Sequence, residues 1–541
     1  MALPTNFFTT QSVLIVDDIY TVRIAVQGML EMLGCKDIHM ASNGERALEL
    51  CNEHHFNFIL CDFNLGKGKD GYQLFEELKL LKLITNNTLF IILSAETTIQ
   101  TLHGIFELQP DDYLLKPFSY QKLKTRLVKA LEKREILGSI FEAITANDYE
   151  RVLEACDIVS KSHPNYILPI MRIRAEAFTR LGRHKQALKI YDLILAKREL
   201  GWAKLGQAIA YYHLEDLPTA VKLLKQLTNE LETKVEALNW LAKIFLKVNK
   251  LDLVEDILNE SVKISPKNIP RQLALANFSI LNDNIDVGLR CFKAILGNTY
   301  FSVHDNIIHH FNYAHCLLDK AKSESQLLRV KLISEVQVIL KNAKNRFDQS
   351  TFLELEKVAL ARIAISQDQL RKANTILDDC KEDIVIRSGN SNILQLAKTW
   401  FELGNYEKYQ TLMKLLPKEA HNDDIESISE ILLIQKTNEK TSAKITKLLD
   451  LNQQALALYQ NGLYPASTSL FLEAFQLIPN NLQLSLNLAQ SISKGWPGDK
   501  SYSLKKTTIK RCVQIIESQS IPIEGTAKAR YESFKDTLKK A

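Results

Sequence analysis

The chain has 541 residues, of which 46% are hydrophobic and 24% are charged, and its formal net charge is only +5. This balance is typical of soluble globular proteins and excludes a strong attraction of the whole chain to nucleic acid or anionic lipid. The length is too great for one hydrophobic core and predicts three or more domains.

No segment approaches the roughly 18 consecutive apolar residues that a membrane span needs. Residues 1–11 also lack the basic and apolar stretches of a secretory signal. We therefore expect a cytoplasmic protein without membrane contact. The eight cysteines contain no Cys-x-x-Cys pair and lie in apolar patterns, so we predict buried free thiols. They are Cys35, Cys51, Cys61, Cys156, Cys291, Cys316, Cys380 and Cys512.

Short apolar runs alternate with amphipathic segments in the first part of the chain. The runs that predict strands are 13–16, 38–41, 58–62, 89–94 and 113–115. Apolar residues at helical spacing follow each of them. This alternation predicts an α/β domain, a doubly wound parallel sheet with helices on both faces.

Polar side chains stand at the carboxyl ends of four predicted strands: Asp17 and Asp18, Asp62, Ser94 and Lys116. Parallel sheets bind ligands just beyond these ends, so we expect the five side chains to meet at one edge. Three crowded carboxylates repel one another unless a cation neutralises them, and an all-oxygen donor set favours Mg²⁺. A carboxylate can also attack phosphorus, while an ammonium and a hydroxyl stabilise phosphoryl oxygens.

In this order, an acidic pair, an Asp, a Ser followed by Ala, and Lys-Pro, the first quarter of the chain resembles the receiver domain of bacterial two-component response regulators. The resemblance implies a flavodoxin-like (βα)5 fold with Asp62 as the phosphoacceptor. It implies that Asp18 binds Mg²⁺ directly and that Asp17 acts mainly through water. The backbone carbonyl of Asn64 would complete the protein ligands.

The resemblance also implies roles for other residues near this edge. Ser94 and Lys116 would hold the phosphoryl oxygens, and Tyr113 matches the family's aromatic switch. Asn64 and Glu96 match positions that tune dephosphorylation. A histidine kinase or a phosphotransfer protein would donate the phosphoryl group. Beyond its own phosphorylation and autodephosphorylation, no enzyme activity is implied.

The loop after the phosphoacceptor departs from the family pattern, which is Met-Pro-Gly-x-Asp-Gly. Residues 64–71 read Asn-Leu-Gly-Lys-Gly-Lys-Asp-Gly, which lacks the proline and is one residue longer. Two glycines in the middle of the loop predict greater flexibility. The departure leaves open the geometry of metal binding and the lifetime of the phosphoryl group.

From about residue 138 the strand signals disappear and helical periodicity dominates. A short turn followed by a small or apolar residue recurs with spacings of 35, 33, 34 and 34 at Val152, Ala187, Ala220, Val254 and Gly288. Further copies end at Ala373, Tyr409 and Ser467. A period near 34 resembles tetratricopeptide (TPR) repeats, which stack helical hairpins into a superhelix with a groove for other proteins.

The expected organisation is an α/β domain followed by an all-α region. Its parts are a receiver over 11–137, TPR-like repeats over 138–300, degenerate helical repeats over 301–416, TPR-like repeats over 425–495 and a basic helical cap over 496–541. The last helix of the receiver continues through 132–137 with no flexible linker. We therefore predict a response regulator in which phosphorylation of the receiver controls the contacts that the repeats make with other proteins.

Two alternatives stay open from the sequence. The basic pairs at 505–506 and 510–511 are compatible with a transcriptional or nucleic-acid-binding regulator, although no helix-turn-helix pattern is visible. A receiver can also act as a phosphate sink without output. A histidine cluster at 304, 309, 310 and 315 lacks the i, i+4 spacing of helical zinc ligands, which favours a solvated or loosely packed helical surface over a metal site.

Overall fold

A computed structural model describes residues 7–85, 88–95, 98–519 and 525–540. The chain forms two compact units. Unit 1 comprises the residues up to 275 together with 297–305, and unit 2 comprises 276–296 and the residues from 306 onward. Helices α13 (Ile269–Leu281) and α14 (Ile285–Thr299) both run through the division between the units. The receiver thus shares one compact unit with the first helical hairpins.

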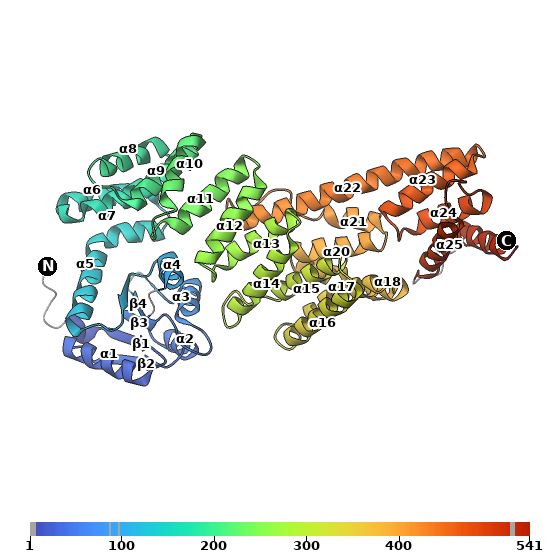
Figure 1. Cartoon of the computed structure of the whole chain (residues 1–541). Helices are drawn as coiled ribbons and strands as arrows, with labels where there is room; N and C mark the ends of the chain where they lie inside the picture. The colour runs from blue at the N-terminus through green and yellow to red at the C-terminus, as the bar shows by residue number, and fades with distance from the viewer. Residues whose placement is uncertain (1–6, 86–87, 96–97, 520–524, 541) are drawn as a thin grey trace. The chain divides into compact units, whose positions relative to one another are not determined.

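Unit 1 begins with the predicted five-stranded parallel sheet (Figure 1). The order of the strands in the sheet is β2-β1-β3-β4-β5. The chain therefore adds β2 on one side of β1 and the later strands on the other side. The strands are β1 (Ser12–Val16), β2 (Asp37–Ala41), β3 (Phe58–Asp62), β4 (Leu89–Ser94) and β5 (Asp112–Leu115). The predicted α/β fold class is confirmed.

Both faces of the sheet are covered because alternate strand residues enter two separate cores. Leu14, Ile59 and Phe90 pack under α2 and α3 with the last turns of α4, whereas Ile15 and Leu60 pack under α1 and α5. Strands that are buried on both sides read as continuous apolar runs, which explains their pattern in the sequence. The helices are α1 (Tyr20–Leu33), α2 (Gly44–Glu53), α3 (Gly71–Leu80), α4 (Ile99–Leu108) and α5 (Tyr120–Thr145).

Helix α5 joins the sheet to the helical region without a break. Leu123 and Leu127 on its first half lie in the core of the sheet, and Ile140 and Ala143 on its second half lie in the core of the next helices. The expected receiver boundary at 137 therefore falls inside one continuous helix of 26 residues.

Consecutive helices of unit 1 form antiparallel hairpins in which each helix from α5 to α12 packs on the next, and α9 also packs on α7 and α11. These helices are α6 (Tyr149–Ser162), α7 (Ile167–Arg180), α8 (His184–Leu195), α9 (Gly201–His213), α10 (Leu217–Leu227), α11 (Lys234–Lys247) and α12 (Leu251–Ile264).

The recurrent turns share one backbone conformation. The first residue of each turn noted in the sequence has a left-handed φ, at Asn147, Gly182, Glu215, Asn249 and Asp283, and again at Asp368, Gly404 and Gly462. The first five lie 35, 33, 34 and 34 residues apart. The small or apolar residue five positions later is buried in every case. The spacing in the sequence therefore corresponds to a repeated hairpin geometry.

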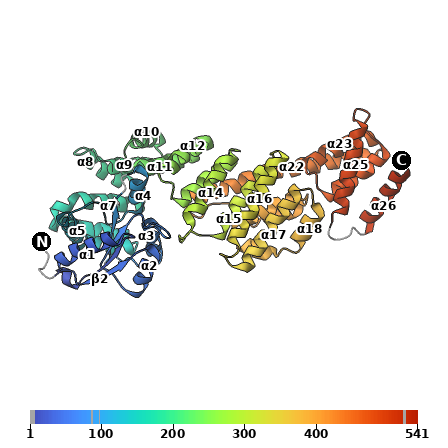
Figure 2. The ribbon, with the colours of Figure 1, turned by 60° about the horizontal axis from the view of Figure 1, so that its bottom comes forward.

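In contrast to unit 1, unit 2 has only helices as secondary-structure elements over its described residues (Figure 2). Its elements after α14 are α15 (Ile307–Ala321), α16 (Gln326–Ala343), α17 (Gln349–Ser366), α18 (Leu370–Asp378), α19 (Glu382–Arg387), α20 (Asn390–Glu402), α21 (Tyr406–Met413), α22 (Ile425–Gln460), α23 (Tyr464–Leu477), α24 (Leu482–Lys494), α25 (Tyr502–Glu517) and α26 (Gly525–Lys540).

A charged cluster lies where α15, α17 and α20 of unit 2 meet. The side chain of Arg362 is only 1% exposed, and its guanidinium lies 2.5 Å from Asp319 and 3.2 Å from Glu402. Lys398 and Lys322 also bind Asp319, at 2.5 and 2.8 Å. Buried charges persist only when they are paired in this way, so the cluster ties the three helices together.

Two of the four clustered histidines are buried, whereas we expected a solvated or loosely packed helical surface. His310 packs against the ring of Phe347, and His315 lies 3.2 Å from the Arg362 guanidinium. The apolar residues of α15 from Phe311 to Leu318 are buried with them and extend beyond a single stripe of the helix. The width of this apolar pattern is the feature of the sequence that indicates burial.

We predict that acid destabilises unit 2 through these histidines. Burial lowers the pKa of His310 to about 4, and burial with the charge of Arg362 lowers that of His315. Since an unfolded histidine titrates near pH 6.5, their stabilisation is complete above that pH and is lost below it. Through the titration of His310 alone, the unfolding free energy of unit 2 should fall by about 2 kcal/mol between pH 7 and pH 5. Urea unfolding of the full chain checks this, and a His310→Gln variant with an unchanged pH slope would contradict it.

All eight cysteines are free and buried, as predicted. Among the described residues, none of the helices combines the length and the apolar character that crossing a bilayer requires.

Candidate functional site

The carboxyl edge of the sheet brings the predicted acidic side chains together. β1 pairs with β3, and β3 pairs with β4, so the ends of these strands lie side by side. One oxygen from each of Asp17, Asp18 and Asp62 lies within 4.8 Å of the others. Asp17 is fully buried and Asp62 is 8% exposed, whereas Asp18 faces solvent. The geometry is a half-open pocket of carboxylates.

Lys116 spans the pocket from the end of β5. Its Nζ lies 2.6 Å from Asp17 Oδ2 and 2.9 Å from Asp62 Oδ2. Burial lowers the pKa of Lys116, but the hydrogen bonds and attraction to the two carboxylates outweigh burial and raise the pKa overall. The ammonium therefore stays charged and lies where it can bind an anion attached to Asp62.

The Asp62 carboxyl is in an unfavourable electrostatic environment. Burial raises its pKa, and the charge of Asp17 adds to this effect. Hydrogen bonds from Lys116 and from the backbone of Asn64 act in the opposite direction without cancelling it. A carboxylate held in this way gains from any additional positive charge in the pocket.

Local backbone contacts fix the acidic pair. The Ile19 N–H donates to Asp17 Oδ1 at 2.9 Å, and the Arg23 guanidinium donates to the Asp17 carbonyl at 2.5 Å. A Cβ on Gly66, which has φ +71°, would lie 2.9 Å from Asp18 Oδ2. Glycine at 66 therefore lets the next loop approach the pocket closely.

That loop, residues 64–71, is anchored at several points although its composition suggested flexibility. Leu65 is buried in the core, and the buried Lys69 ammonium pairs with Glu77 on α3. Asp70 and Gln73 form a reciprocal capping box at the start of α3. The loop thus has a defined path between the phosphoacceptor strand and α3.

The remaining predicted residues take different positions. Ser94 is buried at the end of β4, where its carbonyl accepts the Lys116 N–H at 2.8 Å. Tyr113 is half-buried against the core, and the Asn64 side chain is exposed. Glu96 lies outside the described residues. Of the predicted residues, the three aspartates and Lys116 thus lie together at this edge of the sheet.

The donor set of this pocket fits a hard divalent cation. All three side chains offer carboxylate oxygens, and the structure places their oxygens close enough to share one ion. In the described part of the chain no other group of three or more His, Cys, Asp or Glu residues meets this criterion.

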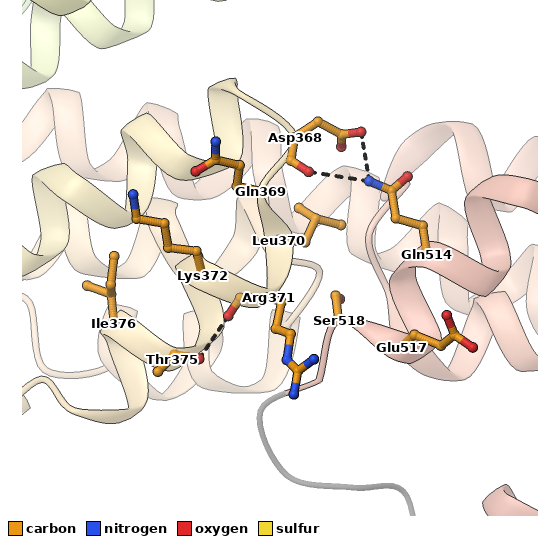
Figure 3. Close-up of a pocket in the computed structure, with 10 residues that line it drawn as sticks. All are labelled: Asp368, Gln369, Leu370, Arg371, Lys372, Thr375, Ile376, Gln514, Glu517 and Ser518. Atoms are coloured by element: carbon orange, nitrogen blue, oxygen red, sulfur yellow. Dashed lines mark hydrogen bonds between the residues drawn. The ribbon is translucent and has the colours of Figure 1, made fainter.

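A second hollow, of about 700 Å³, lies between α18 and α25 in unit 2 (Figure 3). Gln514 donates from its Nε2 to the carbonyl and the carboxylate of Asp368 at 3.3 and 2.8 Å. Arg511, one of the basic residues considered for nucleic acid, is bound to Asp368 and lies 2.8 Å from Asn480. Acidic and basic groups line this hollow together, so its charge does not favour an anion.

Comparisons with known proteins agree with the geometry of the first pocket. Residues 13–128 match the family model described as response regulator receiver domain. The transcriptional regulatory protein ZraR of Escherichia coli O157:H7 is 29% identical over 140 residues, 26% of this chain and 31% of that protein. The aerobic respiration control protein ArcA of Escherichia coli K12 is 26% identical over 172 residues, 31% of this chain and 70% of that protein.

A shorter relative is covered almost completely. The probable chemotaxis protein CheY of Rhizobium etli is 31% identical over 115 residues, which is 21% of this chain and 88% of that protein. By contrast, the chain spans under a third of the length of ZraR. The likeness therefore concerns the α/β domain and its acidic pocket, and leaves the helical region to be interpreted from its own residues.

Proposed function

The N-terminal domain of this chain belongs to the response regulator receiver family, and we propose that the chain is a response regulator whose output is contact with another protein. A receiver is a phosphorylatable signalling domain rather than a catalytic enzyme, and it implies a histidine kinase partner. The observation that carries the proposal is the pocket of Asp17, Asp18 and Asp62 with Lys116 across it.

In the proposed reaction, an oxygen of Asp62 attacks the phosphorus of a phosphohistidine on a kinase or phosphotransfer protein. The O–P bond forms while the P–N bond breaks, and the imidazole leaves. Asp18, Asp62 and the carbonyl of Asn64 would hold Mg²⁺, with Asp17 acting through water. Bound Mg²⁺ supplies positive charge for the phosphoryl oxygens, which Lys116 and Ser94 also bind.

We propose that the helical region is the output module and that its hairpins are TPR-like. Support comes from the left-handed turns 33 to 35 residues apart and from the buried small residue that follows each turn. Grooves of stacked hairpins bind segments of other proteins. The continuous helix α5 offers a path by which inward movement of Ser94 and Tyr113 alters hairpin packing. We expect these steps in the cytoplasm.

Incubating the purified full chain with acetyl phosphate and Mg²⁺ tests the proposal. We expect the mass of one phosphoryl group to be added, to be released by hydroxylamine as for an acyl phosphate, and to be absent in EDTA. Absence of labelling at saturating Mg²⁺ would contradict the proposal. Equal binding of an isolated partner by the labelled and unlabelled chain would contradict the proposed output but not the phosphorylation.

A further inference from the structure

A lysine from the helical region contacts the loop beside the phosphoacceptor, within unit 1. Lys267 lies between α12 and α13, and its Nζ is 2.6 Å from Asp70 Oδ2. The same ammonium lies 5.0 Å from the ring centroid of Phe63 and 5.8 Å from that of Tyr72. Phe63 directly follows Asp62, and Asp70 caps α3. One ammonium therefore touches residues at the two ends of the loop over 64–71.

Further contacts hold this part of the helical region against the receiver. The Gln73 side chain donates to the carbonyls of Asn298 and Tyr300 at 2.9 and 3.3 Å, while its Oε1 accepts the Asp70 N–H. The Arg271 guanidinium lies 2.5 Å from the Glu107 carboxylate on α4. Lys267 thus belongs to a broader interface, and its own position does not depend on a single ion pair.

The position of Lys267 matters because of what the loop carries. Its backbone presents Asn64, and two of its residues, Gly66 and Gly68, have left-handed φ values that favour glycine. Holding Phe63 and Asp70 around one cation restricts the span between them through an ion pair and cation–π attraction. This contact adds a restraint from outside the receiver to those that Leu65, Lys69 and the capping box of Asp70 already provide.

Resting on the proposed function, we infer that Lys267 is a positioning residue for phosphorylation of Asp62: it orders the loop over 64–71 in the arrangement that binds Mg²⁺. Lys267 does not touch the phosphoryl group or the metal and acts through the loop. Because coupling between two sites is reciprocal, occupancy of the acidic pocket strengthens the contact of Lys267 with the receiver. The helical region thereby senses the state of the pocket at this residue.

The first test measures the Mg²⁺ dependence of acetyl phosphate labelling in full-length variants. Lys267→Met should raise the half-saturating Mg²⁺ concentration about threefold to tenfold, the loss expected for one partly exposed charged contact. Lys267→Arg, which keeps the charge and the stacking, should stay within about twofold of the wild type. Lys225→Met on the exposed face of α10 is the matched control and should be unchanged.

The second test uses amide hydrogen exchange of residues 265–272 in the full chain. Mg²⁺ with beryllium fluoride should slow exchange there in the wild type, and this slowing should be lost in Lys267→Met. A wild-type Mg²⁺ dependence in Lys267→Met, or an equal loss in Lys267→Arg, would overturn the inference while leaving phosphorylation intact. A wild-type chain that takes no phosphoryl group would overturn the proposed function instead.

Discussion

Asp62→Asn should abolish acyl phosphate formation in the full chain. The substitution removes the attacking oxygen anion but keeps the shape of the side chain, so labelling by acetyl phosphate with Mg²⁺ should fall to background. Folding should be preserved, since one of three crowded carboxylates is neutralised in a pocket where burial and Asp17 already oppose its charge. Intact mass and thermal unfolding, measured on the same samples, check both statements.

The matched control is Asp37→Asn. Asp37 begins β2 at the opposite, amino edge of the same sheet, where it pairs with Ser12 at the start of β1. Labelling of this variant should equal that of the wild type. Stoichiometric labelling of Asp62→Asn that hydroxylamine releases would show that another carboxylate is the acceptor, and would refute the assignment of Asp62.

The pocket could be predicted from the sequence because each of its residues lies at the end of a strand that can be recognised from neighbouring residues alone. Each of Asp17, Asp62, Ser94 and Lys116 stands at the end of a strand that its own apolar run identifies. Parallel strands in one sheet then place their carboxyl ends at one edge without further information. The acidic pocket and its carboxylate donors therefore follow from the sequence pattern and the parallel topology together.

Contacts between distant segments could not be predicted in this way. Lys267 and Asp70 are 197 residues apart, and periodicity along one helix does not reveal which other segment it meets. Arg362 shows the same limit. It is the sole cation in a strongly apolar stretch of α17, which marks it as unusual, but its partners lie on α15 and α20. Helical periodicity places a residue on a face and leaves its distant partners undetermined.

Asp319→Asn should destabilise unit 2 by about 3–5 kcal/mol, the loss expected when one partner of a buried ion cluster is removed. Asp319 binds all three cations of the cluster, Arg362, Lys322 and Lys398. Its amide replacement leaves Glu402 as the only carboxylate in the cluster, where it pairs with Lys322 and Arg362. The side chain keeps its size, so charge rather than volume accounts for the loss.

Asp286→Asn is the control within the same unit, because Asp286 pairs with Lys320 but its side chain is 80% exposed. An exposed pair contributes less than about 1 kcal/mol, so this variant should unfold almost as the wild type does in urea. Equal unfolding free energies for the two variants would show that the cluster is not stabilising.

The pH dependence of the unfolding free energy independently tests the contribution of the Asp319 charge. The cations around Asp319 hold the pKa of its carboxyl well below its usual range despite burial, which acts the other way. Stabilisation from such a group is complete above the unfolded pKa near 4 and is lost as the pH falls further. The difference between wild type and Asp319→Asn should therefore be constant from pH 7 to 5 and shrink below pH 4. A difference that persists at low pH would assign the loss to packing instead of charge.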